Sequence, residues 1–236
     1  MADKIGFTIL QMELSYQGHF TRPSFRLLTH ESRLLDGLLA GMGQFGVTPA
    51  DIRLDTAVPS LAEAGITCLL HRNGVHLKIR PDRFEASCLK IPEGDVFARV
   101  IRQTHDVVRD SHPPIELQSH TIALPVHGNL EGGVSCADFL RRYITCPPEL
   151  EPTSFRGAIY QLPGEEERLS SSFEIQPSLL HPGALFTRVT LTLDAQRVTA
   201  EKALGAAEAY FRNVLGMLGL EAKGAGGLES VLGGER

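Results

Sequence analysis

The sequence feature that most constrains the fold is an Asn-Gly pair, Asn73-Gly74, set between two strand-type runs. Residues 66–72 (ITCLLHR) precede the pair and residues 75–80 (VHLKIR) follow it. Both residues of an Asn-Gly pair tolerate positive φ angles, which makes the pair the strongest short-range signal for a β-hairpin. The sequence therefore predicts an antiparallel pair of strands at this point.

The rest of the chain alternates between strand-type and helix-type patterns. Further strands are predicted at residues 5–16, 84–89, 115–126, 154–162, 168–176 and 184–193, with a loop at 128–133. Helical spacing of apolar residues predicts helices from Thr29 to Gly46, at 93–110, after Ser135, and at 199–219 with Thr199 as the N-cap. In the first of these helices Gly37, Gly41 and Gly43 weaken the helix but allow it to approach a sheet closely.

This order of elements predicts an α+β fold, with an antiparallel sheet or sheets and long helices packed on one face. In each part of the chain a group of strands is followed by a long amphipathic helix. We therefore expect duplicated halves of a ferredoxin-like or helix-grip-like kind. The expected parts are an N-terminal α+β half at 1–130, a C-terminal α+β half at 131–220 and a disordered tail at 221–236. One continuous sheet that curls around the two long helices is the alternative.

Charge and cysteine content limit the classes of function. The chain has 23 Lys and Arg against 28 Asp and Glu, a net charge of −5, which argues against a surface built as a whole to coat nucleic acid. Its four cysteines (Cys68, Cys88, Cys136 and Cys146) show no C-x-x-C spacing, so we expect reduced thiols and no metal site. We also expect no signal peptide and no membrane segment, and hence a cytoplasmic, bacterial-type protein.

The candidate binding site is a cationic strand. Alternation places Val75, Leu77 and Ile79 in the core, which turns the side chains between them to solvent. Between residues 71 and 109 there are eight Lys and Arg against five Asp and Glu. We therefore expect an anion-binding or partner-binding face made by Arg72, His76, Lys78, Arg80 and Arg83. The alternative is a solvated strand whose charges discourage edge pairing.

Catalytic and cofactor motifs are not found in the sequence. There is no His-x-His pair, no His-Glu-x-x-His, no Gly-x-Ser-x-Gly, no phosphate-binding loop and no dinucleotide fingerprint, so we expect no cofactor and lean away from an enzyme. An unrecognised enzymatic site around His120, His127 and Cys136 remains the third hypothesis. Cys136 stands at a predicted helix N-terminus, where a thiol pKa can be lowered.

A short motif suggests a family. Residues 74–92 (GVHLKIRPDRFEASCLKIP), with Pro81-Asp82-Arg83-Phe84 at their centre, are followed by an amphipathic helix and then the strand at 115–126. This stretch, and the order of elements in 154–215, resemble a sporadically distributed family of uncharacterised bacterial proteins. The resemblance implies a fold and no reaction.

Together these features favour a non-enzymatic binding or scaffold protein, a subunit of a larger bacterial assembly with protein partners. The alternative is an RNA-binding or RNA-processing protein with paired ferredoxin-like halves. The sequence names no small-molecule ligand.

Overall fold

The computed structural model describes residues 4–29, 33–56, 58, 60, 63–92, 95–111, 114–147, 149–158 and 167–223. Within these residues the protein has an α+β fold with a large antiparallel sheet, as the sequence predicts. The strands are β1 (Ile5–Met12), β2 (Leu14–Phe20), β3 (Ile52–Asp55), β4 (Gly65–Leu70), β5 (Val75–Ile79), β6 (Arg83–Cys88), β7 (Leu117–Leu130), β8 (Phe155–Ala158), β9 (Arg168–Pro177), β10 (Leu185–Asp194) and β11 (Leu220–Lys223). The α-helices are α1 (Leu34–Met42), α2 (Val96–Arg109), α3 (Cys136–Leu140) and α4 (Ala200–Met217).

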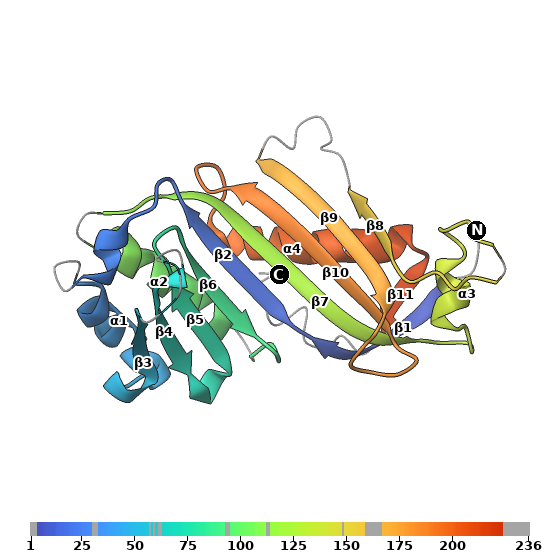
Figure 1. Ribbon diagram of the computed structural model, residues 1–236, viewed down its shortest axis with the longest axis horizontal. Coiled ribbons are helices and arrows are strands. Elements are labelled where there is room, and N and C mark those ends of the chain that lie inside the picture. Colours follow the sequence, from blue (N-terminus) through green and yellow to red (C-terminus); the bar gives the residue numbers. More distant parts are fainter. Residues whose placement is uncertain are drawn as a thin grey trace.

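All eleven strands join one sheet, in which β7 is the central member. The order is β3-β4-β5-β6-β2-β7-β10-β9-β8, and β1 pairs with both β7 and β11. On one side β7 pairs with β2 along its first half and with β1 along its second, and on the other side it pairs with β10 (Figure 1). Of the two sheet arrangements that the sequence allowed, the described residues therefore adopt the continuous one.

The hairpin predicted at Asn73-Gly74 is confirmed, with a longer loop than a two-residue turn. Leu70 pairs with Val75, so residues 71–74 make the connection, and Gly74 takes a positive φ of 62°. Val75, Leu77 and Ile79 are buried and His76 is exposed, as the alternation predicts.

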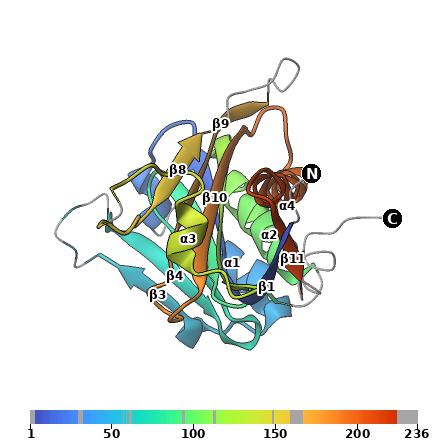
Figure 2. The ribbon, with the colours of Figure 1, turned by 90° about the vertical axis from the view of Figure 1, so that its right-hand side faces the viewer.

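The two longest helices bury their apolar sides against the sheet and each other. Thr199 caps α4 as predicted, and its side chain accepts a hydrogen bond from the backbone N–H of Lys202. α4 packs against β7 and β10, while α2 contacts both β6 and α4. Figure 2 shows α2 and α4 next to each other.

The first helix differs from the prediction in its start and its neighbour. α1 begins at Leu34, because Thr29 instead ends a short 3-10 turn at Phe25–Leu28 and its hydroxyl donates to the carbonyl of Arg26. The close approach that its glycines allow is to α2 rather than to a sheet, since a Cβ on Gly37 would lie 2.9 Å from a methyl of Val107.

Other boundaries also move. The single strand predicted at 5–16 is divided into β1 and β2, and β2 continues to Phe20. β7 continues to Leu130, so Gly128 belongs to a strand and not to the predicted loop. Residues 221–223 form part of β11, although the sequence placed them in the tail. The rest of that predicted tail, 224–236, lies outside the described residues, as do residues 159–162 of the predicted strand at 154–162.

Candidate functional site

One face of the sheet carries polar side chains from β5 to β8, and we call it the polar face. Its residues alternate along each strand with those of the core, and the register places them in rows. One row contains, in order, Ala158, Ser172, Thr190, Ala123, Ser15, Ser87 and His76. The next contains Ser170, Thr192, Thr121, Gln17, Glu85 and Lys78.

These two rows contain hydroxyl, amide and charged groups but no large apolar side chain. Where they cross the centre of the sheet, the hydroxyls of Thr121 and Thr192 lie 3.1 Å apart and share a hydrogen bond. The polar face is therefore continuous across β2, β7 and β10 and connects β5 with β9.

Acidic neighbours partly neutralise the predicted cationic strand. The Arg83 guanidinium donates to Asp82 and to Glu85, each at 2.6 Å, and Arg80 Nε lies 3.5 Å from the same Glu85 carboxylate. Lys78 stands opposite Glu85 in the β5–β6 register. Two of the five predicted cations thus form ion pairs on this face, so its positive charge is smaller than the sequence count suggests.

The other two predicted residues lie differently. His76 is exposed at the end of the first row. Arg72 lies in the hairpin loop rather than on the strand, and its side chain runs beside Gly46. The structure therefore brings His76, Lys78, Arg80 and Arg83 to one face and leaves Arg72 at the end of the hairpin.

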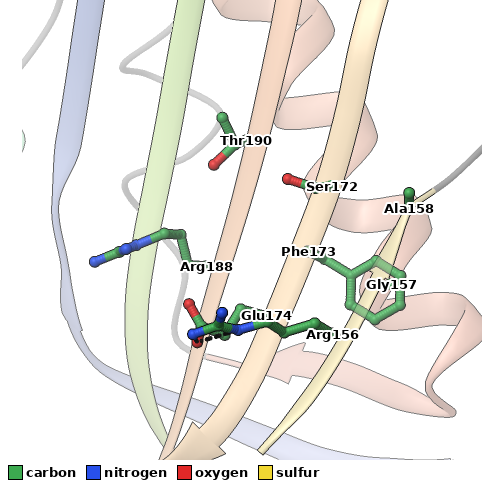
Figure 3. Close-up of a pocket in the computed structure, with 8 residues that line it drawn as sticks. All are labelled: Arg156, Gly157, Ala158, Ser172, Phe173, Glu174, Arg188 and Thr190. Carbon is green, nitrogen blue, oxygen red and sulfur yellow. Dashed lines mark hydrogen bonds and ion pairs between the residues drawn. The ribbon is translucent and has the colours of Figure 1, made fainter.

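A second pair of arginines, which the sequence analysis did not select, flanks the polar face at its other end. Arg156 Nε donates to Glu174 at 2.8 Å, and Arg188 stands opposite Glu174 in the β9–β10 register. With Ser172 and Thr190 they line an open hollow of about 460 Å³ (Figure 3). The signal was present, because alternation in the predicted strand at 184–193 turns Arg188 and Thr190 to the same side.

His19 lies at the cationic end of the polar face formed by β5 and β6, opposite Arg83 in the β2–β6 register. Burial lowers the pKa of His19, and the nearby Arg83 charge lowers it further. A neutral imidazole at this position adds a hydrogen-bonding group and no positive charge.

The structure does not bring together the three residues of the hypothetical enzymatic site, His120, His127 and Cys136. His120 and His127 are seven residues apart on β7, so their side chains leave opposite faces of the sheet. His120 contacts Tyr16 and the Val198 carbonyl, whereas His127 contacts the Ser178 hydroxyl at 2.8 Å.

The thiol of Cys136 donates to the carbonyl of Gly183, and burial raises its pKa, contrary to the lowering expected at a helix N-terminus. The three residues therefore do not meet on one face of the sheet, since His120 and His127 lie on opposite faces.

All four cysteines are free, and Cys68 and Cys88 are buried in strands as expected. In the part of the chain that the structure describes, no cluster of three or more His, Cys, Asp and Glu side chains is placed to hold a metal ion. The helices of that same part include none that is both long and apolar enough to cross a membrane. A scan against protein-family models and a search of curated proteins both find no match to this chain.

Proposed function

We propose that the protein is a non-enzymatic binding protein, a subunit of a larger assembly that presents its polar face to a partner. The observation that carries this proposal is the pair of polar rows that crosses the sheet from β5 to β9, with arginines near both ends. A sheet face that served only as a core layer would carry apolar side chains.

The chemistry of the face favours a partner with acidic, hydrogen-bonding groups. Ser and Thr hydroxyls can both donate and accept, and Lys78, Arg83, Arg156 and Arg188 supply charge at the two ends. Protein interfaces usually owe their affinity to aromatic or large aliphatic side chains at the centre, and the two rows contain no side chain of either kind. Recognition here is therefore hydrated, guided by charge and weakened by salt.

The element order supports duplicated halves within this single sheet. The first would use β2, α1, β5, β6, α2 and β7, and the second would use β7, α3, β9, β10, α4 and β11. In the sheet, the strands of the first half stand in the order β5-β6-β2-β7, which is the order of a ferredoxin-like fold. Each half would then contribute one cationic end to the polar face.

The test is an affinity purification of the tagged protein from its native host, with and without nuclease. A variant with His76→Ala, Lys78→Ala and Arg80→Ala should fold normally and lose its partner. Arg212→Ala is the matched control, because Arg212 on α4 pairs with Glu208 away from the polar face. Partners retained by the triple variant would show that this end of the face is not the site.

Single-stranded RNA is the second candidate, favoured by the combination of hydroxyls and arginines on one face. Phosphate oxygens accept from Arg and Lys, and ribose 2′-hydroxyls can pair with Ser and Thr. The two rows contain no Phe, Tyr or Trp, so recognition would involve the backbone and not stacked bases. This candidate predicts RNA binding that weakens steeply as salt increases, and binding that is absent or insensitive to salt would eliminate it.

A further inference from the structure

A cavity of about 490 Å³ lies on the other side of the sheet from the polar face, where β7 begins and α4 begins. Its floor includes Ile115, Leu117 and His120. One wall comes from α2 and the other from the residues that lead into α4. None of these residues belongs to the polar face.

We propose that this cavity binds an organic phosphate of about the size of a mononucleotide. Three arginines line it from two walls: Arg102 and Arg109 from α2, and Arg197 from the turn before α4. Arg102, His105 and Arg109 follow one another at three- and four-residue steps, which places them on the same side of α2. Guanidinium groups bind phosphate through paired hydrogen bonds and a full charge.

The start of α4 adds a second source of positive potential. α4 is 18 residues long, and Thr199, Ala200 and Glu201 at its start line the cavity. The first amides of a helix have no partner within the helix, and they point toward the N-terminal end, where they favour an anion. An anion site of this kind, made by arginines and a helix N-terminus, needs neither the phosphate-binding loop nor the dinucleotide fingerprint that the sequence lacks.

Acidic groups also face the cavity: Glu116 and Glu201 line it, and carboxylates beside it pair with its arginines. Arg102 Nε lies 3.7 Å from Glu201, and Arg197 Nε lies 3.7 Å from Asp194. Arg109 contacts Asp106 at 3.0 Å and Asp110 at 3.1 Å. The three arginine side chains are each more than half exposed, and ion pairs of this kind contribute little stability. A phosphate dianion with several acceptors can therefore compete with these carboxylates for the arginines.

Hydrogen bonds hold this wall of the cavity against β7. Three hydrogen bonds tie residues 195–198 to β7: Ala195 N–H to the Gln118 carbonyl at 3.1 Å, the Gln196 side chain to the Leu117 carbonyl at 3.3 Å, and His120 to the Val198 carbonyl at 2.8 Å. Binding need not order this segment, so the entropic cost of binding is reduced.

The size of the cavity indicates more than a phosphate group. Small-molecule sites commonly enclose roughly 300–1,000 Å³, and this cavity of about 490 Å³ lies in that range. Ile115, Leu117 and Val198 offer an apolar surface for a ring or a chain, next to the imidazole of His105. Burial, together with the charge of Arg109, lowers the pKa of His105, so a neutral ring is available for hydrogen bonding to that part of the ligand.

The test is calorimetric titration of the full chain at low salt with the four ribonucleoside monophosphates, glucose 6-phosphate and inorganic phosphate. We expect at least one organic phosphate to bind more tightly than inorganic phosphate. The double variant Arg102→Gln with Arg197→Gln should bind about tenfold more weakly or worse, since hydrogen bonds to charged groups are lost. A second measurement is NMR of the histidine side chains, in which we expect the His105 signal to shift when the phosphate is added.

Arg212→Gln is the control, because Arg212 lies on α4, whose first residues line the cavity, and pairs with Glu208 outside the cavity. Binding that this control preserves and the double variant loses supports the proposal. No binding of any phosphate probe, undiminished binding in the double variant, or an equal loss in the control would overturn it. The triple variant of the polar face should keep the phosphate site intact, so the two proposals succeed or fail separately.

Discussion

His120 illustrates how a single buried residue fixes the geometry around it. The Val198 carbonyl can only accept, so His120 Nε2 must carry the proton, and Nδ1 then accepts from the Tyr16 hydroxyl at 2.6 Å. Burial lowers the pKa of His120 and raises the pKa of Tyr16, so both groups stay neutral. This histidine is a positioning residue for the segment that leads into α4.

Removing the hydroxyl of this pair should destabilise the protein. Tyr16→Phe leaves His120 Nδ1 buried without its donor, which costs about 1–3 kcal/mol of unfolding free energy. Urea unfolding measures the loss. Tyr143→Phe is the comparison, because the Tyr143 hydroxyl donates to the Leu218 carbonyl in a less buried position and should cost less. A Tyr16→Phe protein as stable as the wild type would contradict this role.

The sequence could predict which side chains face solvent but not what they contact. Alternation was enough to place His76 and Lys78 on the surface of β5. The partners of His120 are 104 and 78 residues away in the chain, and no local pattern encodes contacts of that kind. The cavity at the start of α4 was missed for the same reason, because its walls come from α2, β7 and the turn after β10.

At the scale of elements, five strands followed their pattern, whereas the start of the first helix did not. A two-residue period with β-branched residues correctly predicted β4, β5, β6, β9 and β10. Thr29 is a good capping residue by type, but its hydroxyl serves a 3-10 turn, and α1 starts after Arg33 with a positive φ of 57°. Capping residues also favour turns, so residue type alone could not distinguish the two roles.

Glycines in two helices should respond oppositely to substitution. In α4, Gly205 has open space around its Cβ position, so Gly205→Ala should stabilise the protein by about 0.5–1 kcal/mol through helix propensity. In α1, a Cβ on Gly37 would press on Val107 of α2, and overpacking costs about 1–3 kcal/mol. We therefore expect Gly37→Ala to be the less stable variant in thermal melts. Equal gains for both substitutions would mean that the α1–α2 contact adjusts freely.

For the whole molecule, the element order could be predicted, but not how its parts join. The join depends on β7, which pairs with β2 on one side and β10 on the other over much of the same length. Pairings between segments this far apart in sequence are set by the global packing of the sheet. The single sheet also separates the two proposed sites, with the polar face on one side and the cavity on the other.

Buried histidines should make the stability of the whole molecule fall as the solution becomes mildly acidic. Burial is the main cause of a lowered pKa at four positions: His19, His105, His120 and His127. In the unfolded chain these groups bind protons below a pKa of about 6.5, while in the folded protein they stay neutral to lower pH. The unfolded state therefore binds more protons in this window, and linkage requires stability to decrease as pH falls.

This window is separate from that of the carboxylates. Asp51 and Glu131 have lowered pKa values because of hydrogen bonds, so their stabilising effect is lost only as pH falls below the unfolded values near 4. Urea unfolding between pH 7.5 and pH 5 should thus show a decreasing free energy that comes from the histidines. His120→Asn should lower stability at pH 7.5 yet flatten the dependence on pH, because the variant lacks one titrating group. Stability that stays constant over this range would show that the four imidazoles can be protonated without loss of the fold.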